Sequence, residues 1–252
     1  MTSTIQQKCI TTTNISTIQT EHIISNFHKS IGWDITTNDV IPSAPLSAGT
    51  WDEIITLVAT SLQNSGLSCI RHDEVMKWHQ ELGDIHANDS PLISDLPRYL
   101  SQFHNHGIII SICTSDDRDS TTKCMANWGI TNLVDYSICG DELVPEECKP
   151  SSEPLYELCR RAGVLPSECL VVGDTSNDTQ MGVRGGAGYV VGVLTGSGTK
   201  DQLLNTGANI VLPNIGYLEK LLLLSSKSVG LGDIRQLSIG NVMDIDMLDR
   251  LE

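Results

Sequence analysis

Thr114 and Ser115 occupy a position in the sequence that suits the binding of an anion. They follow the apolar run Ile108 to Cys113, which has the composition of a buried β-strand. In open parallel sheets, ligands bind beyond the carboxyl ends of the strands. Hydroxyl and backbone N–H groups at such a strand end can hold the oxygens of a phosphoryl group.

A second apolar run, Cys169 to Gly173, leads into an acidic loop that contains Asp174 and Asp178. We expect this loop at the same edge of the sheet as the first run's end. Mg²⁺ prefers one or two carboxylates, with waters and a substrate phosphate as its other ligands. Lys149, which precedes Pro150 and a predicted helix, supplies a positive charge for the same anionic site.

The chain around these residues alternates helices with short apolar strands, which predicts an α/β core of parallel strands joined by right-handed crossovers. The predicted strands cover 108–113, 136–139, 169–173, 189–194 and 210–212. The predicted helices of this part cover 94–105, 118–128, 153–162, 179–185 and 216–224. Residues 21–93 are helical instead, with helices expected over 22–30, 51–65 and 73–82. A capping box of Thr50 and Glu53 opens the second of these three helices.

The composition argues against several classes of function. With 16 Lys and Arg against 31 Asp and Glu, the formal charge of −15 leaves no basic face for nucleic acid or anionic membrane surfaces. The apolar runs are far shorter than the roughly 20 residues of a membrane-spanning helix. The eight cysteines form no C-x-x-C pair, which favours reduced thiols inside the cell over a disulfide framework. We expect a cytoplasmic protein, with a mitochondrial address as the weaker alternative because residues 1–20 lack Arg.

Thr114, Lys149-Pro150 and the run GDTSND that ends at Asp178 resemble, in order and spacing, the second, third and fourth motifs of the haloacid dehalogenase-like (HAD) hydrolases. The surrounding sequence, from about Ser94 to Leu224, is similar to the phosphoglycolate-phosphatase-like branch of that family. The resemblance implies an α/β fold with a HAD-like, Rossmann-type parallel sheet core and a small helical cap domain. It also implies Mg²⁺-dependent hydrolysis of a small phosphorylated metabolite, a phosphoglycolate-like phosphate monoester.

The resemblance implies a role for each candidate residue. Thr114 and Ser115 would bind the transferring phosphoryl group, and Lys149 would neutralise the phosphate and the nucleophile. Asp174 would ligate Mg²⁺, with Asp178 supporting the metal site. Thr114 and Lys149 are therefore the candidate catalytic residues of this chain.

We expect four segments along the chain. Residues 1–20 form a poorly defined N-terminal segment, 21–93 the helical cap, 94–225 the HAD-like α/β core and 226–252 an acidic C-terminal tail. Apolar residues from Val242 to Leu251 are spaced like one helix face, so a partner-binding helix is an alternative to a loosely docked tail.

The sequence departs from the family at the first motif, D-x-D-x-T/V, which supplies the nucleophile and the general acid/base. Residues 1–20 contain no Asp or Glu, and the nearest imitation, Thr12, Asn14 and Ser16 in TTNIST, offers no carboxylate. In the family the strand of this motif lies between those of the second and fourth motifs. We therefore expect a split sheet unless Ile5 to Thr13 fills the gap. Two hypotheses follow. The chain is either a truncated or spliced product of an active phosphatase, or an inactive pseudophosphatase that acts as a binding or regulatory protein. Both hypotheses predict negligible turnover by this chain.

Overall fold

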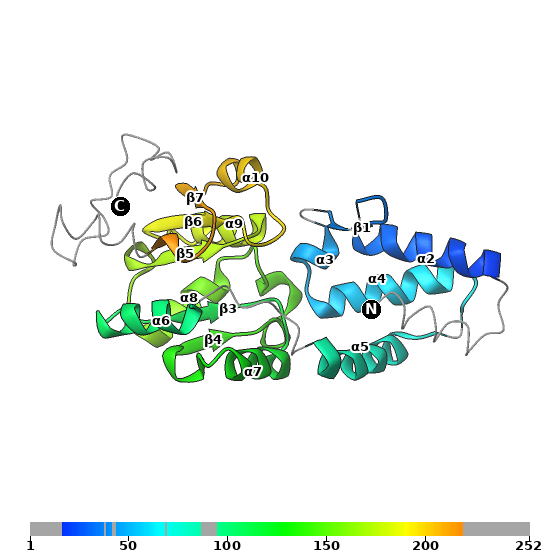
Figure 1. The fold of residues 1–252 in the computed structure, drawn as a ribbon, viewed down its shortest axis with the longest axis horizontal. Coiled ribbons are helices and arrows are strands. Elements are labelled where there is room, and N and C mark those ends of the chain that lie inside the picture. Colours follow the sequence, from blue (N-terminus) through cyan, green and yellow to red (C-terminus); the bar gives the residue numbers. More distant parts are fainter. Residues whose placement is uncertain (1–16, 38, 42–43, 69, 87–94, 219–252) are drawn as a thin grey trace. The chain divides into compact units, whose positions relative to one another are not determined.

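Buried apolar side chains form separate clusters on the two sides of residue 90. The computed structural model describes residues 17–37, 39–41, 44–68, 70–86 and 95–218. It divides the chain into two units, residues 1–90 and 91–252 (Figure 1). Within the described ranges, no helix combines the length and the apolar character needed to cross a membrane.

The first unit is built mainly from three helices, α2 (Thr17–Ile31), α4 (Trp51–Asn64) and α5 (His72–His86). Their apolar faces meet in one core, in which Phe27, Leu62 and Ile70 are almost fully buried. The predicted capping box at the start of α4 is confirmed. The Glu53 N–H donates to Thr50 Oγ1 at 3.3 Å, and the Thr50 N–H donates to Glu53 Oε2 at 2.8 Å.

Three short elements between α2 and α4 were not predicted. A short antiparallel pair joins β1 (Trp33–Asp34) to β2 (Asp39–Val40), and α3 (Pro45–Ala48) follows. Proline is favourable at the first position of a helix, where its missing N–H has no intrahelical partner to lose.

The second unit contains the five predicted strands, with small differences at their ends. They are β3 (Ser111–Cys113), β4 (Tyr136–Ile138), β5 (Leu170–Gly173), β6 (Tyr189–Val193) and β7 (Ile210–Leu212). The helices are α6 (Leu96–Asn105), α7 (Arg118–Asn127), α8 (Glu153–Ala162), α9 (Ser176–Arg184) and α10 (Lys200–Asn205). Four short 3₁₀ helices also occur, η1 (Thr131–Leu133), η2 (Gly140–Glu142), η3 (Pro145–Glu147) and η4 (Pro166–Glu168).

The described strands of this unit form two parallel sheets (Figure 1). In the first, β3 pairs with β4, and Cys113 lies opposite Ile138. In the second, β6 lies between β5 and β7, and Gly173 lies opposite Gly192. No strand within the described residues pairs with both β3 and β5. The split therefore falls where the resemblance places the first-motif strand, and the segment considered for that gap, residues 5–13, lies outside the described ranges.

Helix α8 packs against both sheets, and Lys149 lies in the turn that leads into it. Its buried side chains Leu155 and Cys159 contact Val171 of β5 and Met181 of α9, and Cys113 of β3 is partly buried against the same cluster. Burial of a large apolar side chain contributes about 1.5–3 kcal/mol, so this cluster fixes α8 against β5 and α9.

Three expectations fall on parts of the chain that the structure does not describe. The predicted helix over 216–224 runs past residue 218, the last described residue. The acidic tail at 226–252 and most of the N-terminal segment at 1–20 lie outside the described ranges as well.

Candidate functional site

Lys149 lies at the centre of the candidate site. Its Nζ donates to Asp178 Oδ1 at 2.8 Å and to the carbonyl oxygen of Cys113 at 3.2 Å. The two side chains of the ion pair are 13% and 10% exposed. Because Cys113 ends β3 and Asp178 lies in the first turn of α9, the ammonium group connects the end of one sheet to the helix that follows the other.

Burial and charge act in opposite directions on this ion pair. Burial alone lowers the pKa of Lys149, but the charge of Asp178 and its hydrogen bond outweigh burial and raise the pKa above its ordinary value. Burial raises the pKa of Asp178, and the charge of Lys149 with bonds from Lys149 and Thr175 brings it below its ordinary value. Both groups are therefore held in their charged forms at neutral pH.

Thr175 holds the second oxygen of the same carboxylate. Its backbone N–H and its hydroxyl donate to Asp178 Oδ2 at 3.0 and 2.7 Å. Thr175 is also the N-cap of α9, since its hydroxyl accepts from the Asp178 N–H at 3.3 Å. Gly173 lets the two segments approach, because a Cβ there would lie 2.1 Å from the Cβ of Asp178.

Asp174 follows β5 directly and is partly buried. Burial and the nearby charge of Asp178 raise the pKa of Asp174. Hydrogen bonds from its own N–H and the Ser197 N–H, together with the charge of Lys149, oppose that rise in pKa. The protein's own groups thus compensate the negative charge of Asp174 less completely than that of Asp178. A bound cation would supply the positive charge that is missing.

Thr114 and Ser115 lie where β3 ends. The Thr114 N–H extends the pairing with β4 by donating to the Ile138 carbonyl oxygen at 3.1 Å. Its hydroxyl donates to Asp116 Oδ2 at 3.2 Å and accepts from the Asp116 N–H at 3.1 Å. Gly140 packs against Ser115, whose carbonyl oxygen would lie 2.4 Å from a Cβ at that glycine. These bonds and contacts fix the turn that leads into α7.

The structure brings the predicted residues Lys149, Asp174 and Asp178 together through ion pairing and charge interactions. Thr114 joins them as the neighbour of Cys113, whose carbonyl oxygen accepts from Lys149. No role was predicted from the sequence for Thr175 or for the turn at residues 196–198. The turn could have been predicted as a glycine-rich segment that follows a strand, TGSG from Thr195 to Gly198.

Carboxylates at this site are too few for a complete protein cage around a metal. Across the described part of the chain, no group of three or more His, Cys, Asp or Glu side chains could hold a metal ion. Mg²⁺ does not need such a group, because it keeps several waters and usually binds one or two carboxylates with a substrate phosphate. Both oxygens of Asp178 accept hydrogen bonds from Lys149 and Thr175, so Asp174 fits the role of metal ligand better.

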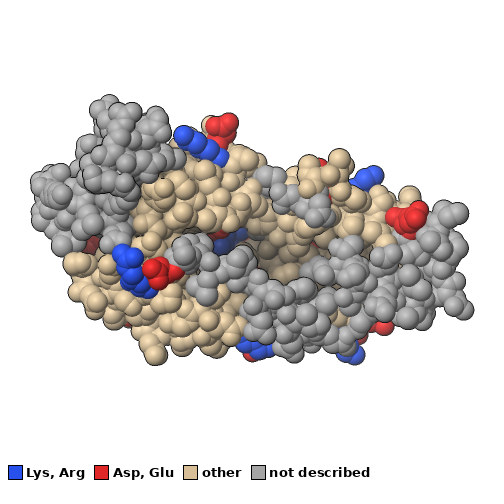
Figure 2. All heavy atoms as spheres, viewed as in Figure 1, with Lys and Arg blue, Asp and Glu red and all other residues tan. Residues whose placement is uncertain are grey.

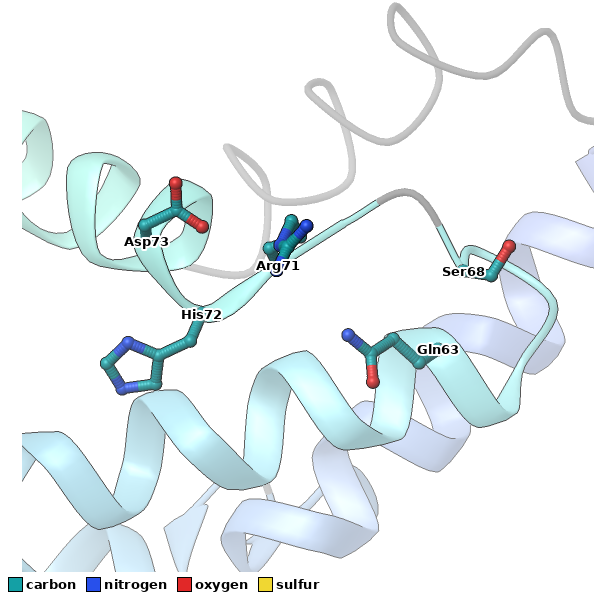
Figure 3. A pocket seen from close by; sticks show the side chains of 5 residues that line it. All are labelled: Gln63, Ser68, Arg71, His72 and Asp73. Atoms are coloured by element: carbon teal, nitrogen blue, oxygen red, sulfur yellow. The ribbon is translucent and has the colours of Figure 1, made fainter.

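A pocket of about 600 Å³ lies in the first unit, and none of the predicted site residues lines it. Its lining residues come from the end of α4, the connection to α5 and the start of α5 (Figure 3), and they are Gln63, Ser68, Arg71, His72 and Asp73. The Gln63 Nε2 donates to the Ile70 carbonyl oxygen at 2.8 Å, and His72 Nε2 lies 3.2 Å from Asp52 Oδ1. The pocket thus carries both signs of charge and no group that points to a single ligand.

Charged side chains on the face drawn in Figure 2 form small separate groups of both signs. The basic atoms on that face do not join into a continuous patch such as nucleic-acid backbones require.

A family model described as haloacid dehalogenase-like hydrolase matches residues 9–186. Phosphoglycolate phosphatases from Pectobacterium atrosepticum and Haemophilus influenzae are 29% identical over 135 residues and 30% identical over 108 residues. These alignments cover 51% and 43% of this chain, and 56% and 47% of the relatives, so the chain spans about half the length of the curated relatives it matches. The crystal structure of a predicted phosphoglycolate phosphatase from Haemophilus somnus 129pt matches with a TM-score of 0.59 at 19% identity, over 78% of this chain and 90% of that one, which is a likeness of fold.

Proposed function

Because the chain belongs to the haloacid dehalogenase-like hydrolase family, we propose that its core binds a small phosphate monoester together with Mg²⁺ at the strand ends. The observation that carries this proposal is the buried ammonium of Lys149, which is held at 2.8 Å by Asp178 and at 3.2 Å by the Cys113 carbonyl oxygen. An ammonium group fixed in this way presents a positive charge without a conformational search, which favours an anionic ligand.

Each residue of the proposed site has a separate task. The hydroxyl groups of Thr114 and Ser115 and the N–H of Ser115 donate to phosphoryl oxygens, and Lys149 neutralises part of the charge of those oxygens. Asp178 positions Lys149 rather than contacting the ligand. Asp174 holds Mg²⁺, which when bound supplies positive charge to the phosphoryl oxygens.

The substrate class follows from the relatives. Their name, phosphoglycolate phosphatase, describes hydrolysis of a small monoester, and the alignments that connect them to this chain cover about half of each relative. We therefore propose a phosphoglycolate-like monoester as the ligand. The first unit, proposed as the cap at residues 21–93, would select among such ligands.

We further propose that the 252-residue chain binds this ligand without hydrolysing it, as a pseudophosphatase. The family match begins at residue 9 and includes the segment TTNIST, in which Thr12 and Asn14 are the nearest imitation of the first motif's two carboxylates. A Thr hydroxyl and an Asn amide provide neither an aspartyl nucleophile nor a general acid. The competing proposal is an active phosphatase of which this sequence is one part.

Restoring the carboxylates tests the proposal. We expect the chain as printed to show no Mg²⁺-dependent hydrolysis of 2-phosphoglycolate or p-nitrophenyl phosphate above background. The double variant Thr12→Asp/Asn14→Asp should gain activity, because loss of a nucleophile commonly costs about 10⁴–10⁶-fold in rate. Adding Asp174→Asn to the double variant should remove the gain. Mg²⁺-dependent turnover by the unaltered chain, itself abolished by Asp174→Asn, would overturn the pseudophosphatase proposal.

A further inference from the structure

A turn that follows β6 lies against Asp174, although the two segments are about twenty residues apart in sequence. The Gly198 N–H donates to the backbone carbonyl oxygen of Asp174 at 2.9 Å. The Ser197 N–H lies beside the Asp174 carboxylate and lowers its pKa. The backbone of the turn therefore contacts both the main chain and the side chain of this aspartate.

The two glycines of the turn are required by these contacts. A Cβ built at Gly196 would lie 1.7 Å from Oδ2 of Asp174, and one built at Gly198 would lie 2.3 Å from the Asp174 carbonyl oxygen. Neither glycine has a backbone conformation that excludes other residues, since their φ angles lie outside the positive range. Space beside Asp174, rather than turn geometry, therefore accounts for glycine at both positions.

We infer that the turn Gly196–Gly198 is a positioning element that fixes the Asp174 carboxylate in the orientation needed to hold a divalent cation. This inference rests on the proposed function, because it assigns the turn to the proposed metal site. An aspartate at a strand end can rotate about its side-chain bonds, and rotation moves the carboxylate oxygens away from a bound ion. One oxygen is confined by the Gly196 backbone, and the Ser197 N–H lies beside the same carboxylate. Residues that orient a ligand in this way commonly change metal affinity by 10–100-fold.

Amide hydrogen exchange in the metal-free, full-length protein tests the positioning contact by itself. We expect Asp174→Ala to speed exchange at Ser197 by about tenfold or more, because the carboxylate beside its N–H is lost. Exchange at Gly198 serves as the internal control. Its acceptor is the main-chain oxygen of Asp174, which the variant keeps, so its rate should stay within about twofold. An unchanged rate at Ser197 would overturn the inference.

Mg²⁺ affinity tests the consequence. We expect Gly196→Ala to raise the dissociation constant for Mg²⁺, measured by calorimetry, by about tenfold or more, because the added methyl displaces the carboxylate. Ser197→Ala is the matched control. It keeps the backbone N–H, so its dissociation constant should stay within about twofold of the unaltered protein.

The two measurements separate the inference from the proposed function. An unaltered protein that binds no Mg²⁺ would contradict the proposed metal site, while the exchange rates would still decide whether the turn holds Asp174. Mg²⁺ binding by the unaltered protein together with undiminished binding by Gly196→Ala would overturn the inference and leave the proposed function standing.

Discussion

Lys149 forms a buried ion pair and also donates a hydrogen bond to a main-chain oxygen. Its partners are a carboxylate on α9 and a main-chain oxygen at the end of β3. Breaking a buried ion pair by removing one partner typically costs about 3–5 kcal/mol, because the other charge stays buried without compensation. The stability of the second unit should therefore depend on this one side chain.

Lys149→Met should destabilise the protein by about 3 kcal/mol at neutral pH, measured by urea unfolding. The folded pKa of Asp178 is lowered, so its stabilising contribution is present above its ordinary pKa and is lost as pH falls through the folded pKa. The folded pKa of Lys149 is raised, so its contribution is full below its ordinary pKa and is lost as pH rises through the folded value. The cost of the substitution should thus shrink as pH falls, because the unpaired Asp178, whose pKa is raised by burial, takes a proton.

Lys123→Met provides the control for that measurement. Lys123 pairs with Asp119 at 2.8 Å, but the two side chains are 45% and 79% exposed. Exposed pairs contribute about 0–1 kcal/mol, so this variant should unfold near the midpoint of the unaltered protein at each pH. Equal effects of the two substitutions would contradict a special role for the buried pair.

Thr114→Val should weaken phosphate binding, while the loss of the two hydrogen bonds to Asp116 should affect only the turn before α7. Valine keeps the shape of threonine and removes the hydroxyl proposed to donate to a phosphoryl oxygen, which is worth about tenfold in affinity. Calorimetric titration with orthophosphate in the presence of Mg²⁺ measures the change. Thr122→Val is the matched control, because its hydroxyl donates only to the Arg118 carbonyl oxygen in α7 among the bonds described here. Equal affinities for all three proteins would rule out the assigned role of Thr114.

At the scale of the elements, helix α4 depends on its first turn. Thr50→Ala removes the side-chain acceptor of the Glu53 N–H and should lower the free energy of unfolding of the first unit by about 1 kcal/mol. Thr60→Ala, at an exposed position in the middle of the same helix, should instead be neutral or slightly stabilising because alanine has the higher helix propensity. Urea unfolding followed by circular dichroism compares the two variants. A lower free energy of unfolding for both variants would contradict the helix-capping role of Thr50.

The strands of the core could be predicted because each is an apolar run bounded by polar residues or glycine. Strand β7, at Ile210–Leu212, was predicted to the residue. The run from Ile108 was predicted too long, because pairing with β4 begins only at Ser111. Helix α10 was missed although Thr199 and Gln202 form a capping box, since six mostly polar residues give no clear periodicity.

The site was harder to predict from the sequence than the strands were. Strand ends marked Thr114 and Asp174, but the contact between Lys149 and Asp178 spans 29 positions and joins the turn before α8 to α9, so it cannot be predicted from local spacing. The family resemblance placed both residues at one site but did not pair them. Contacts made by the backbone, such as those of the Gly196–Gly198 turn, cannot be predicted from the types of side chain in the sequence.

At the scale of the whole molecule, the proposed binding site lies beside a division in the sheet. The described strands form the pair β3–β4 and the triple β5–β6–β7, and Lys149 with the α8 cluster connects them. The groups proposed to bind phosphate and metal come from both sides of this division. Binding at the site should therefore stabilise the second unit as a whole, by an amount that grows with the logarithm of the ligand concentration relative to its dissociation constant.

Calorimetric titration of the 252-residue chain with Mg²⁺ in the presence of orthophosphate tests the central claim most directly. We expect saturable binding by the unaltered protein, a dissociation constant raised by about tenfold or more in Asp174→Asn, and no change in Asp201→Asn, an exposed residue of α10. Absence of binding by the unaltered chain, or equal binding by Asp174→Asn, would contradict the proposed phosphate and metal site.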